Sequence, residues 1–321
     1  MLAVNSYCLA LGATGSVGSA FVTKVLETDR PTTILVRNRE KAKRLFGKKS
    51  GLEIVEGDVL DSDLVSRLAR GKNFIFHGIN YPYDKWEGNM EKATANVIKA
   101  AKQNKATILF PGNIYNFGMT TPITEDTRPA PITKKGKIRV KLEMMLKDAV
   151  IEGNCRVLIL RLPDFFGPNV TNGLMMPIFK NALEGKPMKW LIRTNIPHQL
   201  VYILDAGEVF VRLMYREDLA NYEEVNFGGR KVSSVEHWLE KIGELAGTKP
   251  KIKKISKFAL TLLSPFVPVV REVKEMAYLF ENNIELNDDK LKKMIPDFQP
   301  TPMKDANQET LDWFKRHIFE S

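Results

Sequence analysis

The chain has 321 residues, of which 44% are hydrophobic and 27% are charged, and its formal net charge is +10. These values are ordinary for a globular protein with a full core, and two cysteines are too few for a disulfide-rich class. The positive charge suits an anionic ligand, and no interleaving of arginine with aromatic residues is typical of a nucleic-acid surface. We therefore expect an anionic or sugar-like small-molecule partner and no nucleic acid.

The cysteines, the histidines and the start of the chain indicate which kinds of site and segment to expect. Cys8 and Cys155 fall in predicted core strands, where small apolar residues are common, so we expect neither a disulfide nor a metal pair. The start of the chain has no signal-peptide pattern, and the apolar run 258–270 contains two prolines and is too short to cross a bilayer. We expect a cytoplasmic protein with no membrane span. We also expect no metal site, because the four histidines lie far apart, at His77, His198, His237 and His317.

The first predicted elements form a strand, a glycine-rich turn and a helix. The strand begins at Tyr7, and three glycines then follow at a spacing of three residues before apolar residues recur at helical spacing. Such a turn lets the backbone approach a pyrophosphate, and the helix N-terminus offers N–H groups and a positive dipole end. We therefore predict a dinucleotide-binding turn made by Gly12, Thr14, Gly15, Ser16, Val17 and Gly18.

Apolar strands alternate with amphipathic helices up to residue 162. This alternation is typical of a parallel sheet covered on both faces, a doubly wound α/β fold. The predicted strands are 33–36, 53–56, 73–77, 107–110 and 156–162, and the predicted helices are 40–46, 62–68, 91–103 and 138–152.

The pattern loosens after residue 163 and becomes richer in proline. We expect residues 1–168 to form the dinucleotide-binding (Rossmann) domain, with its sheet completed by strands near 200–204 and 224–227. Residues 169–321 are expected to form mainly a smaller C-terminal substrate lobe.

An ordered series of motifs resembles the short-chain dehydrogenase/reductases, in their extended branch, the NAD-dependent epimerase/dehydratase family. The resemblance implies a sheet of about seven strands, a C-terminal substrate lobe and a homodimer formed through the helices 91–103 and 138–152. It also implies that Asp58 and Val59 lie at the adenine, that Gly78, Ile79 and Asn80 lie beside the nicotinamide ribose, and that Pro163 borders the cofactor. The motifs are Gly12-Ala-Thr-Gly15-Ser-Val-Gly18, Gly57-Asp58-Val59, Phe76-His77-Gly78, Arg161-Leu-Pro163-Asp-Phe-Phe-Gly167-Pro168, Gly185-Lys-Pro187, Val201-Tyr-Ile-Leu-Asp205 and Val225-Asn226-Phe-Gly228-Gly229.

The end of the second strand indicates which dinucleotide is bound. NAD-selective sites carry a carboxylate about 20 residues past the glycine motif, where it binds the ribose 2′-hydroxyl. Here the sequence is Arg37-Asn38-Arg39, and a guanidinium suits a 2′-phosphate. We predict NADP(H) in preference to NAD(H), with Arg37 and Arg39 as ligands; the alternative is that both arginines only begin a surface helix.

The acid–base residues differ from those of the family that the chain resembles. Family members use a tyrosine and a lysine four residues later on one helix, and alignment on Glu143 puts Lys135 and Arg139 at these positions. Lys135 is our first candidate for the proton donor or base, since Arg139 one turn away disfavours its charged form. Arg139 stays charged and would hold the nicotinamide ribose. Tyr115 is a second candidate, and Asn113, in the place of a family serine, would bind a substrate oxygen.

Further candidates line the expected substrate pocket. The segment 81–85 repeats the Tyr-x-x-x-Lys spacing but follows the wrong strand, and Pro82 disfavours a helix there, so Tyr81 and Tyr83 are assigned to pocket lining. His198 and Arg193 are assigned to substrate binding, with a purely structural histidine and a solvated arginine as alternatives. The segment 249–270 is interpreted as a cover over the pocket, with contact to an anionic membrane as the alternative.

Two functions remain open at this point. The first is an NADP-dependent oxidoreductase or epimerase/dehydratase with an atypical acid–base site, acting on a sugar-like or other small carbonyl or alcohol. The second is a catalytically silent NADP(H)-binding protein that serves as a redox sensor or assembly partner, since the cofactor motif is complete and the family's catalytic pair is not.

Overall fold

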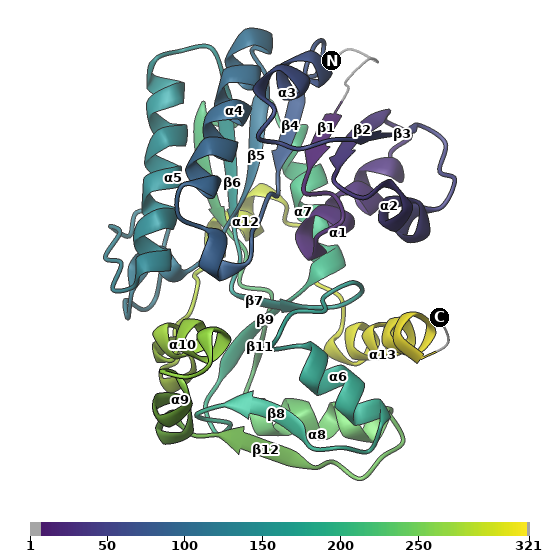
Figure 1. Cartoon of the computed structure of the whole chain (residues 1–321), viewed down its shortest axis with the longest axis vertical. Helices are drawn as coiled ribbons and strands as arrows, with labels where there is room; N and C mark the ends of the chain where they lie inside the picture. The colour runs from purple at the N-terminus through teal and green to yellow at the C-terminus, as the bar shows by residue number, and fades with distance from the viewer. Residues whose placement is uncertain (1–7, 320–321) are drawn as a thin grey trace. The chain divides into compact units, whose positions relative to one another are not determined.

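The structure is a computed structural model that describes residues 8–319, apart from the side chains of residues 268 and 269 (Figure 1). Tyr7, where the first predicted strand began, lies outside the described residues. The chain divides into two units. The first comprises the described residues up to Asn116 together with 134–162 and 204–226, and the second comprises 117–133, 163–203 and the described residues from Phe227 onward.

The first unit is built on a parallel sheet of seven strands in the order β10-β6-β5-β4-β1-β2-β3 (Figure 1). The order reverses between β1 and β4, as a doubly wound fold requires, so the predicted fold class is confirmed. The strands are β1 (Cys8–Leu11), β2 (Thr32–Val36), β3 (Leu52–Glu56), β4 (Phe74–His77), β5 (Thr107–Gly112), β6 (Arg156–Arg161) and β10 (Tyr222–Asn226). The helices are α1 (Ser16–Leu26), α2 (Arg39–Phe46), α3 (Ser62–Leu68), α4 (Asn89–Asn104), α5 (Lys134–Ile151) and α7 (Ile203–Met214), with short 3₁₀ turns η1 (Tyr83–Lys85) and η2 (Tyr115–Phe117).

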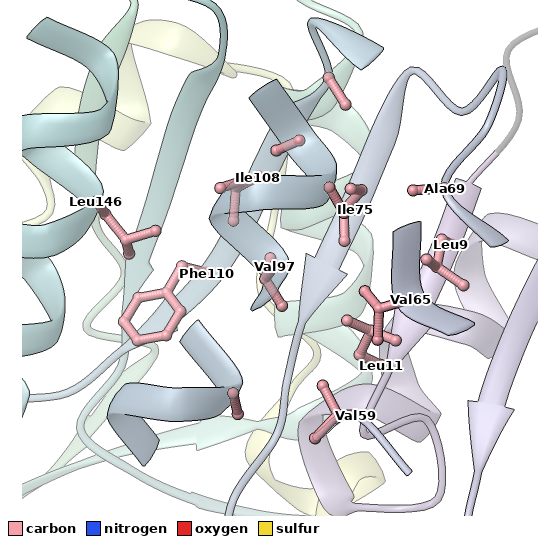
Figure 2. Close-up of a cluster of buried hydrophobic side chains, with 14 of the residues drawn as sticks. Leu9, Leu11, Val59, Val65, Ala69, Ile75, Val97, Ile108, Phe110 and Leu146 are labelled. Atoms are coloured by element: carbon pink, nitrogen blue, oxygen red, sulfur yellow. The ribbon is translucent and has the colours of Figure 1, made fainter. Parts of the chain in front are cut away.

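Apolar side chains fill both faces of this sheet. Leu9, Leu11 and Ile75 lie on one face in a cluster with Val97 of α4 and Leu146 of α5 (Figure 2). On the opposite face three aromatic rings from α1, β4 and α7 pack together, with the Phe21 and Phe76 rings stacked at 4.2 Å and Phe210 set edge-on to both. Successive side chains of a strand point to opposite faces of the sheet, so β4 contributes Ile75 to one cluster and Phe76 to the other. The two predicted core cysteines are indeed buried free thiols, and burial raises the pKa of Cys8 to about 12.

Local signals explain where several helices begin. The Asp61 carboxylate accepts the N–H groups of Asp63 and Leu64 and so caps α3, and the Asn38 side chain caps α2 through the N–H of Lys41. These caps satisfy donors that have no partner inside the helix. Both helices therefore start immediately after the turns that follow β2 and β3, at the carboxyl edge of the sheet.

The second unit contains shorter elements. A three-stranded sheet has the order β11-β9-β7, and β12 pairs with β8 in a separate parallel ribbon. The strands are β7 (Asp164–Phe166), β8 (Met188–Leu191), β9 (His198–Tyr202), β11 (Arg230–Val232) and β12 (Ile252–Ile255). The helices are α6 (Met176–Leu183), α8 (Val235–Leu245), α9 (Lys257–Leu263), α10 (Pro268–Glu275), α11 (Tyr278–Glu281), α12 (Asp289–Met294) and α13 (Met303–Phe314), and the last is followed by a π-helical turn η3 (Lys315–Phe319).

One predicted strand belongs to a different sheet. The strand near 200–204 was expected to complete the large sheet, but it is β9 and pairs with β7 and β11 instead. Of the two expected additions, the strand near 224–227 does join the large sheet, as β10 beside β6. An apolar run identifies a strand but does not specify its partner, because pairing depends on residues far away in the sequence. Among the described residues no helix is both long and apolar enough to span a membrane.

Candidate functional site

The glycine turn between β1 and α1 is packed backbone against backbone. Gly12 has a φ of +77°, and a Cβ placed on it would lie 2.3 Å from the carbonyl oxygen of Gly78. A Cβ on Gly18 would lie 2.2 Å from the Gly12 oxygen. Gly15 is the N-cap of α1 and provides no side-chain cap, so the first turn of the helix presents its backbone to an incoming group. The turn therefore has the shape of a cradle for a pyrophosphate, which tolerates no side chain at Gly12 or Gly18.

The remaining predicted cofactor residues of the first unit lie after the carboxyl ends of β2, β3 and β4. The Arg37 guanidinium lies over the Tyr81 ring at 5.9 Å, and the Arg39 Nε is 3.8 Å from a carboxylate oxygen of Glu56. Asp58 accepts the N–H of Leu60 at 2.9 Å. Gly78 donates its N–H to the Leu11 carbonyl at 2.9 Å, which joins the segment 78–80 to the end of β1. These residues are thus gathered at one edge of the sheet, whereas the side chain of Val59 points into the core.

Tyr81 is placed between the two charges that follow β2 and β3. Burial raises the pKa of Tyr81, the Asp58 carboxylate raises it further, and the Arg37 guanidinium opposes both effects. A phenol held in its neutral form beside a guanidinium offers an aromatic face and a hydroxyl donor. Tyr81 consequently belongs to the group of residues around Arg37, and not to the cluster of Tyr83, Tyr115 and Lys135 described next.

Tyr83, Tyr115 and Lys135 meet in the first unit. The hydroxyls of Tyr83 in η1 and Tyr115 in η2 are 3.3 Å apart, and the Lys135 Nζ lies 4.8 Å from the centroid of the Tyr83 ring. Lys135 is buried in the first turn of α5, while Tyr83 is partly exposed. Sequence reasoning named all three residues but did not group them. Two phenols and an ammonium can donate, accept and stabilise a proton in transfer.

Arg139 is held by the end of β5. Its Nη2 donates to the Pro111 carbonyl, and its guanidinium lies 4.7 Å from the centroid of the Phe110 ring. Burial lowers the pKa of Arg139, the Glu143 carboxylate opposes that shift, and Arg161 adds to it. The neighbouring His77 is buried and donates to or accepts from Thr94 at 2.9 Å; burial, aided by Arg139, lowers its pKa to about 3. His77 is therefore neutral at physiological pH.

A buried ion pair supports the turn that carries Tyr115. Both Nη atoms of Arg161 donate to the Glu143 carboxylate, at 3.0 and 3.2 Å, and Arg161 Nη1 also donates to the Asn113 carbonyl at 3.0 Å. The Asn113 side-chain oxygen in turn accepts the N–H of Tyr115 at 3.0 Å. Asn113 thus shapes the turn. We did not predict this role of Arg161, although an arginine at the end of an otherwise apolar strand was a visible signal.

Three predicted residues lie in the second unit. His198 Nε2 is 2.9 Å from a carboxylate oxygen of Asp164, and its ring packs against Trp190 and Phe280. Arg193 donates to the carbonyl of Glu281 at 3.2 Å, and Pro163, which follows β6 in the chain, is buried. The structure describes these residues within their own unit. Within residues 8–319 no group of three or more histidine, cysteine, aspartate or glutamate side chains has the arrangement of a metal site.

A family model and a curated protein match parts of this chain. Residues 12–112 match a family model described as NAD(P)H-binding. A UDP-N-acetyl-alpha-D-glucosaminuronate decarboxylase of Bacillus cytotoxicus is 23% identical over 301 residues, covering 86% of this chain and 92% of its own length.

Solved structures extend the similarity over nearly the whole chain. UDP-glucuronic acid 4-epimerase from Bacillus cereus, in complex with NAD, superposes with a TM-score of 0.79 at 15% identity and covers 98% of both chains. A dTDP-glucose 4,6-dehydratase from Bacillus anthracis, also in complex with NAD, gives a TM-score of 0.78 at 17% identity and covers 97% of both chains. The chain therefore has an NAD(P)H-binding domain at residues 12–112, and its fold is that of the sugar-nucleotide epimerases and dehydratases that the motifs resemble.

Proposed function

We propose that this protein is an NADP-dependent enzyme of the epimerase, dehydratase or reductase type that acts on a sugar nucleotide or a similar anionic carbonyl or alcohol. Relatives named for UDP- and dTDP-sugar chemistry support this substrate class, as does the net charge of +10. The observation that carries the proposal is the cluster of Tyr83, Tyr115 and Lys135 at the sheet edge that also holds the glycine turn.

The cofactor would rest on the turn between β1 and α1. The close approach of Gly12, Gly18 and Gly78 leaves room for backbone alone, which fits a pyrophosphate seated on the N-terminus of α1. A nicotinamide held there would supply hydride chemistry at the substrate carbon. The chain itself would orient this group and provide the protons.

Arg37 supports the preference for NADP(H). It is exposed at the end of β2 and lies over the Tyr81 ring, so a 2′-phosphate would meet a guanidinium instead of a carboxylate. Arg39 contributes less, because it already faces Glu56.

Titration calorimetry tests this preference. The protein should bind NADP(H) more tightly than NAD(H), and Arg37→Asp should reverse the order by removing a charge-assisted bond and adding a repelling carboxylate. Arg44→Asp makes the same charge change on the exposed side of α2 and should leave the order unchanged. Equal affinities in the unchanged protein would refute the NADP preference.

The two phenols would take the place of the tyrosine that α5 lacks. A phenolate formed on Tyr83 or Tyr115 would be stabilised by the Lys135 ammonium and could accept the proton of a substrate hydroxyl. Asn113 holds the backbone N–H of Tyr115, and Arg139 is engaged by Pro111 and Phe110. We therefore assign proton transfer to Tyr83, Tyr115 and Lys135, and positioning to Asn113 and Arg139.

Turnover of a panel of UDP- and dTDP-sugars tests the assignment, with nicotinamide absorbance and chromatography of the products as readouts. Lys135→Met and Tyr115→Phe should each reduce turnover by about 100-fold or more while cofactor affinity is unchanged. Lys137→Met, an exposed position on the same helix, is the matched control and should have full activity. Full activity in Lys135→Met would eliminate Lys135 as the proton donor or base.

A silent NADP(H)-binding protein is the second candidate. The observation that favours it is the replacement of the helical Tyr-x-x-x-Lys pair by Lys135 and Arg139, with Arg139 committed to structural contacts. Absence of any turnover across the panel, together with tight NADP(H) binding, would support this function and refute the enzymatic one.

The homodimer implied by the resemblance would use α4 and α5. The outer side of α5 exposes Met144 and Ile151 among several lysines, so such a dimer would tighten as salt screens the lysines. Sedimentation at two salt concentrations tests this: a monomer at both would exclude the dimer.

A further inference from the structure

The second unit exposes large apolar side chains where a helix surface is usually polar. Phe258 is 76% exposed, Leu262 60% and Phe266 81%, and Leu263 and Val267 are also exposed. These five residues, here called the apolar patch, belong to α9 and the turn that follows it (Figure 1). Contiguous exposed apolar side chains mark an interaction surface.

Two residues of the patch, Phe258 and Leu262, form the outward face of α9. Leu260 and Ser264, four residues apart, are buried and fix the helix to its unit. Phe258 and Leu262, also four residues apart, therefore lie together on the opposite side. A surface helix usually has polar residues on its solvent-facing side, so packing within this unit does not explain why Phe258 and Leu262 are apolar.

A cluster of cations adjoins the patch. Residues 249–271 contain five lysines and one arginine, and no aspartate or glutamate. Lys253 of β12 is paired in register with Lys189 of β8, so two exposed ammonium groups lie side by side, and Lys254 is exposed as well. Lys257 instead pairs with Glu281 at 2.7 Å. The segment thus joins an apolar surface to a positive one.

We propose that the apolar patch inserts into the headgroup region of a membrane that contains anionic lipids, with Lys189 and Lys253 at the phosphates. Exposed aromatic and aliphatic side chains beside a lysine cluster have the two components of interfacial binding, and the charge complements a negative leaflet. Helix α9 follows directly on β12 and leads into α10 (Figure 1), so the apolar patch would lie on the membrane surface and would not cross the membrane. The cover over the pocket that the sequence suggested explains the patch less well, since phenylalanine and leucine gain little by facing a polar sugar nucleotide.

Co-flotation of the full chain with vesicles tests the proposal. Phosphatidylcholine vesicles containing phosphatidylserine should carry the protein upward, pure phosphatidylcholine should carry little, and added salt should weaken the binding. Phe258→Ser with Phe266→Ser should reduce partitioning by roughly tenfold or more, because each buried side chain contributes to transfer. Lys189→Glu with Lys253→Glu should remove the dependence on phosphatidylserine. Met119→Ser with Ile132→Ser, two apolar residues elsewhere in this unit that are 61% and 55% exposed, is the matched control and should bind as the unchanged protein does.

Three outcomes would overturn the proposal. The first is no co-flotation of the unchanged protein with anionic vesicles. The second is equal co-flotation of the Phe258/Phe266 variant, provided that circular dichroism shows both proteins folded. The third is self-association, seen by sedimentation without lipid and lost in that variant, which would make the patch a contact between copies.

Discussion

The buried pair of Glu143 and Arg161 offers a quantitative test of how the site is held. Arg161 is 2% exposed and Glu143 9% in their side chains, with two hydrogen bonds between them. Glu143 also faces Arg139, and Arg161 lies 3.6 Å from Glu224. Replacing Glu143 by methionine leaves two buried guanidiniums close together, with only the partly exposed Glu224 beside Arg161. Replacing Arg161 by methionine instead leaves Glu143 with the buried Arg139.

The two replacements should therefore differ in cost. Removing one partner of a buried pair costs about 3–5 kcal/mol. We expect Glu143→Met near the upper end of that range, about 5 kcal/mol, and Arg161→Met near the lower end, about 3 kcal/mol. The double variant should cost less than the sum by about 2 kcal/mol, because neither group is then left facing an absent partner.

Urea unfolding of the four proteins measures these differences, with an unchanged m-value as the check that the unfolded state is the same. A larger cost for Arg161→Met than for Glu143→Met would refute the role given to Arg139. Costs that add within about 0.5 kcal/mol would show that the pair is not coupled. Since Arg161 also holds Asn113, turnover in the folded Arg161→Met protein should fall through misplacement of Tyr115.

Three further outcomes follow from the described geometry. Gly12→Ala should abolish cofactor binding, measured by calorimetry, and should lower the free energy of unfolding by more than about 2 kcal/mol in urea, because the added Cβ meets backbone atoms. Gly71→Ala is the control: it has a φ of +70° but open space around the added Cβ, so it should cost only about 1 kcal/mol and bind the cofactor normally. The His77 pKa, lowered to about 3, means that the unfolded state binds a proton that the folded state refuses; His77 should thus destabilise the fold by about 1.4 kcal/mol per unit as the pH falls from about 6.5 towards 3, and this slope should be absent from acid titrations of His77→Gln. Cys8 should resist alkylation in the native state and react only on unfolding, so labelling at the native rate of an exposed thiol would contradict its burial.

The part of the site built from backbone was predictable from the sequence. A strand, three spaced glycines and an amphipathic helix describe one continuous segment, and its geometry needs only local φ values and the close approach of Gly12 to Gly78. The missing carboxylate at Arg37 was equally visible, since the end of a buried strand fixes its place. Fold class followed from the same alternation of strands and helices.

The part of the site built from side chains was not grouped correctly. Tyr83 and Tyr115 are 32 residues apart, and each lies in a short 3₁₀ turn that has no strong sequence signal. Their meeting follows from a rule that was available: both turns follow adjacent parallel strands, β4 and β5, whose carboxyl ends share one edge. The helical spacing of Lys135 and Arg139 favoured a catalytic pair on one helix, whereas the phenols of Tyr83 and Tyr115 lie in 3₁₀ turns.

The sheet assignment of β9 failed for a related reason. Its run from His198 to Tyr202 ends in three buried residues typical of a core strand, but such a run does not specify the neighbouring strand. In the structure β9 pairs with the short strand β7, where Asp164 carries the partner of His198. The three residues of β7 have no local sequence pattern that predicts a strand.

The glycine turn could be predicted from the sequence and the side-chain cluster could not, because the two kinds of chemistry place different demands on the chain. Binding a pyrophosphate requires backbone at close range, and only glycine permits it, so the cradle can be recognised in the sequence. Proton transfer requires a titratable group at a given point in space, and a helix, a 3₁₀ turn or a neighbouring loop can each supply it. In the proposed site the phenols lie in η1 and η2 and not on α5, and the Lys135 Nζ lies 4.8 Å from the centroid of the Tyr83 ring. The absence of Tyr-x-x-x-Lys from α5 is thus weak grounds for proposing a silent protein, since two phenols and a lysine meet at the edge of the sheet.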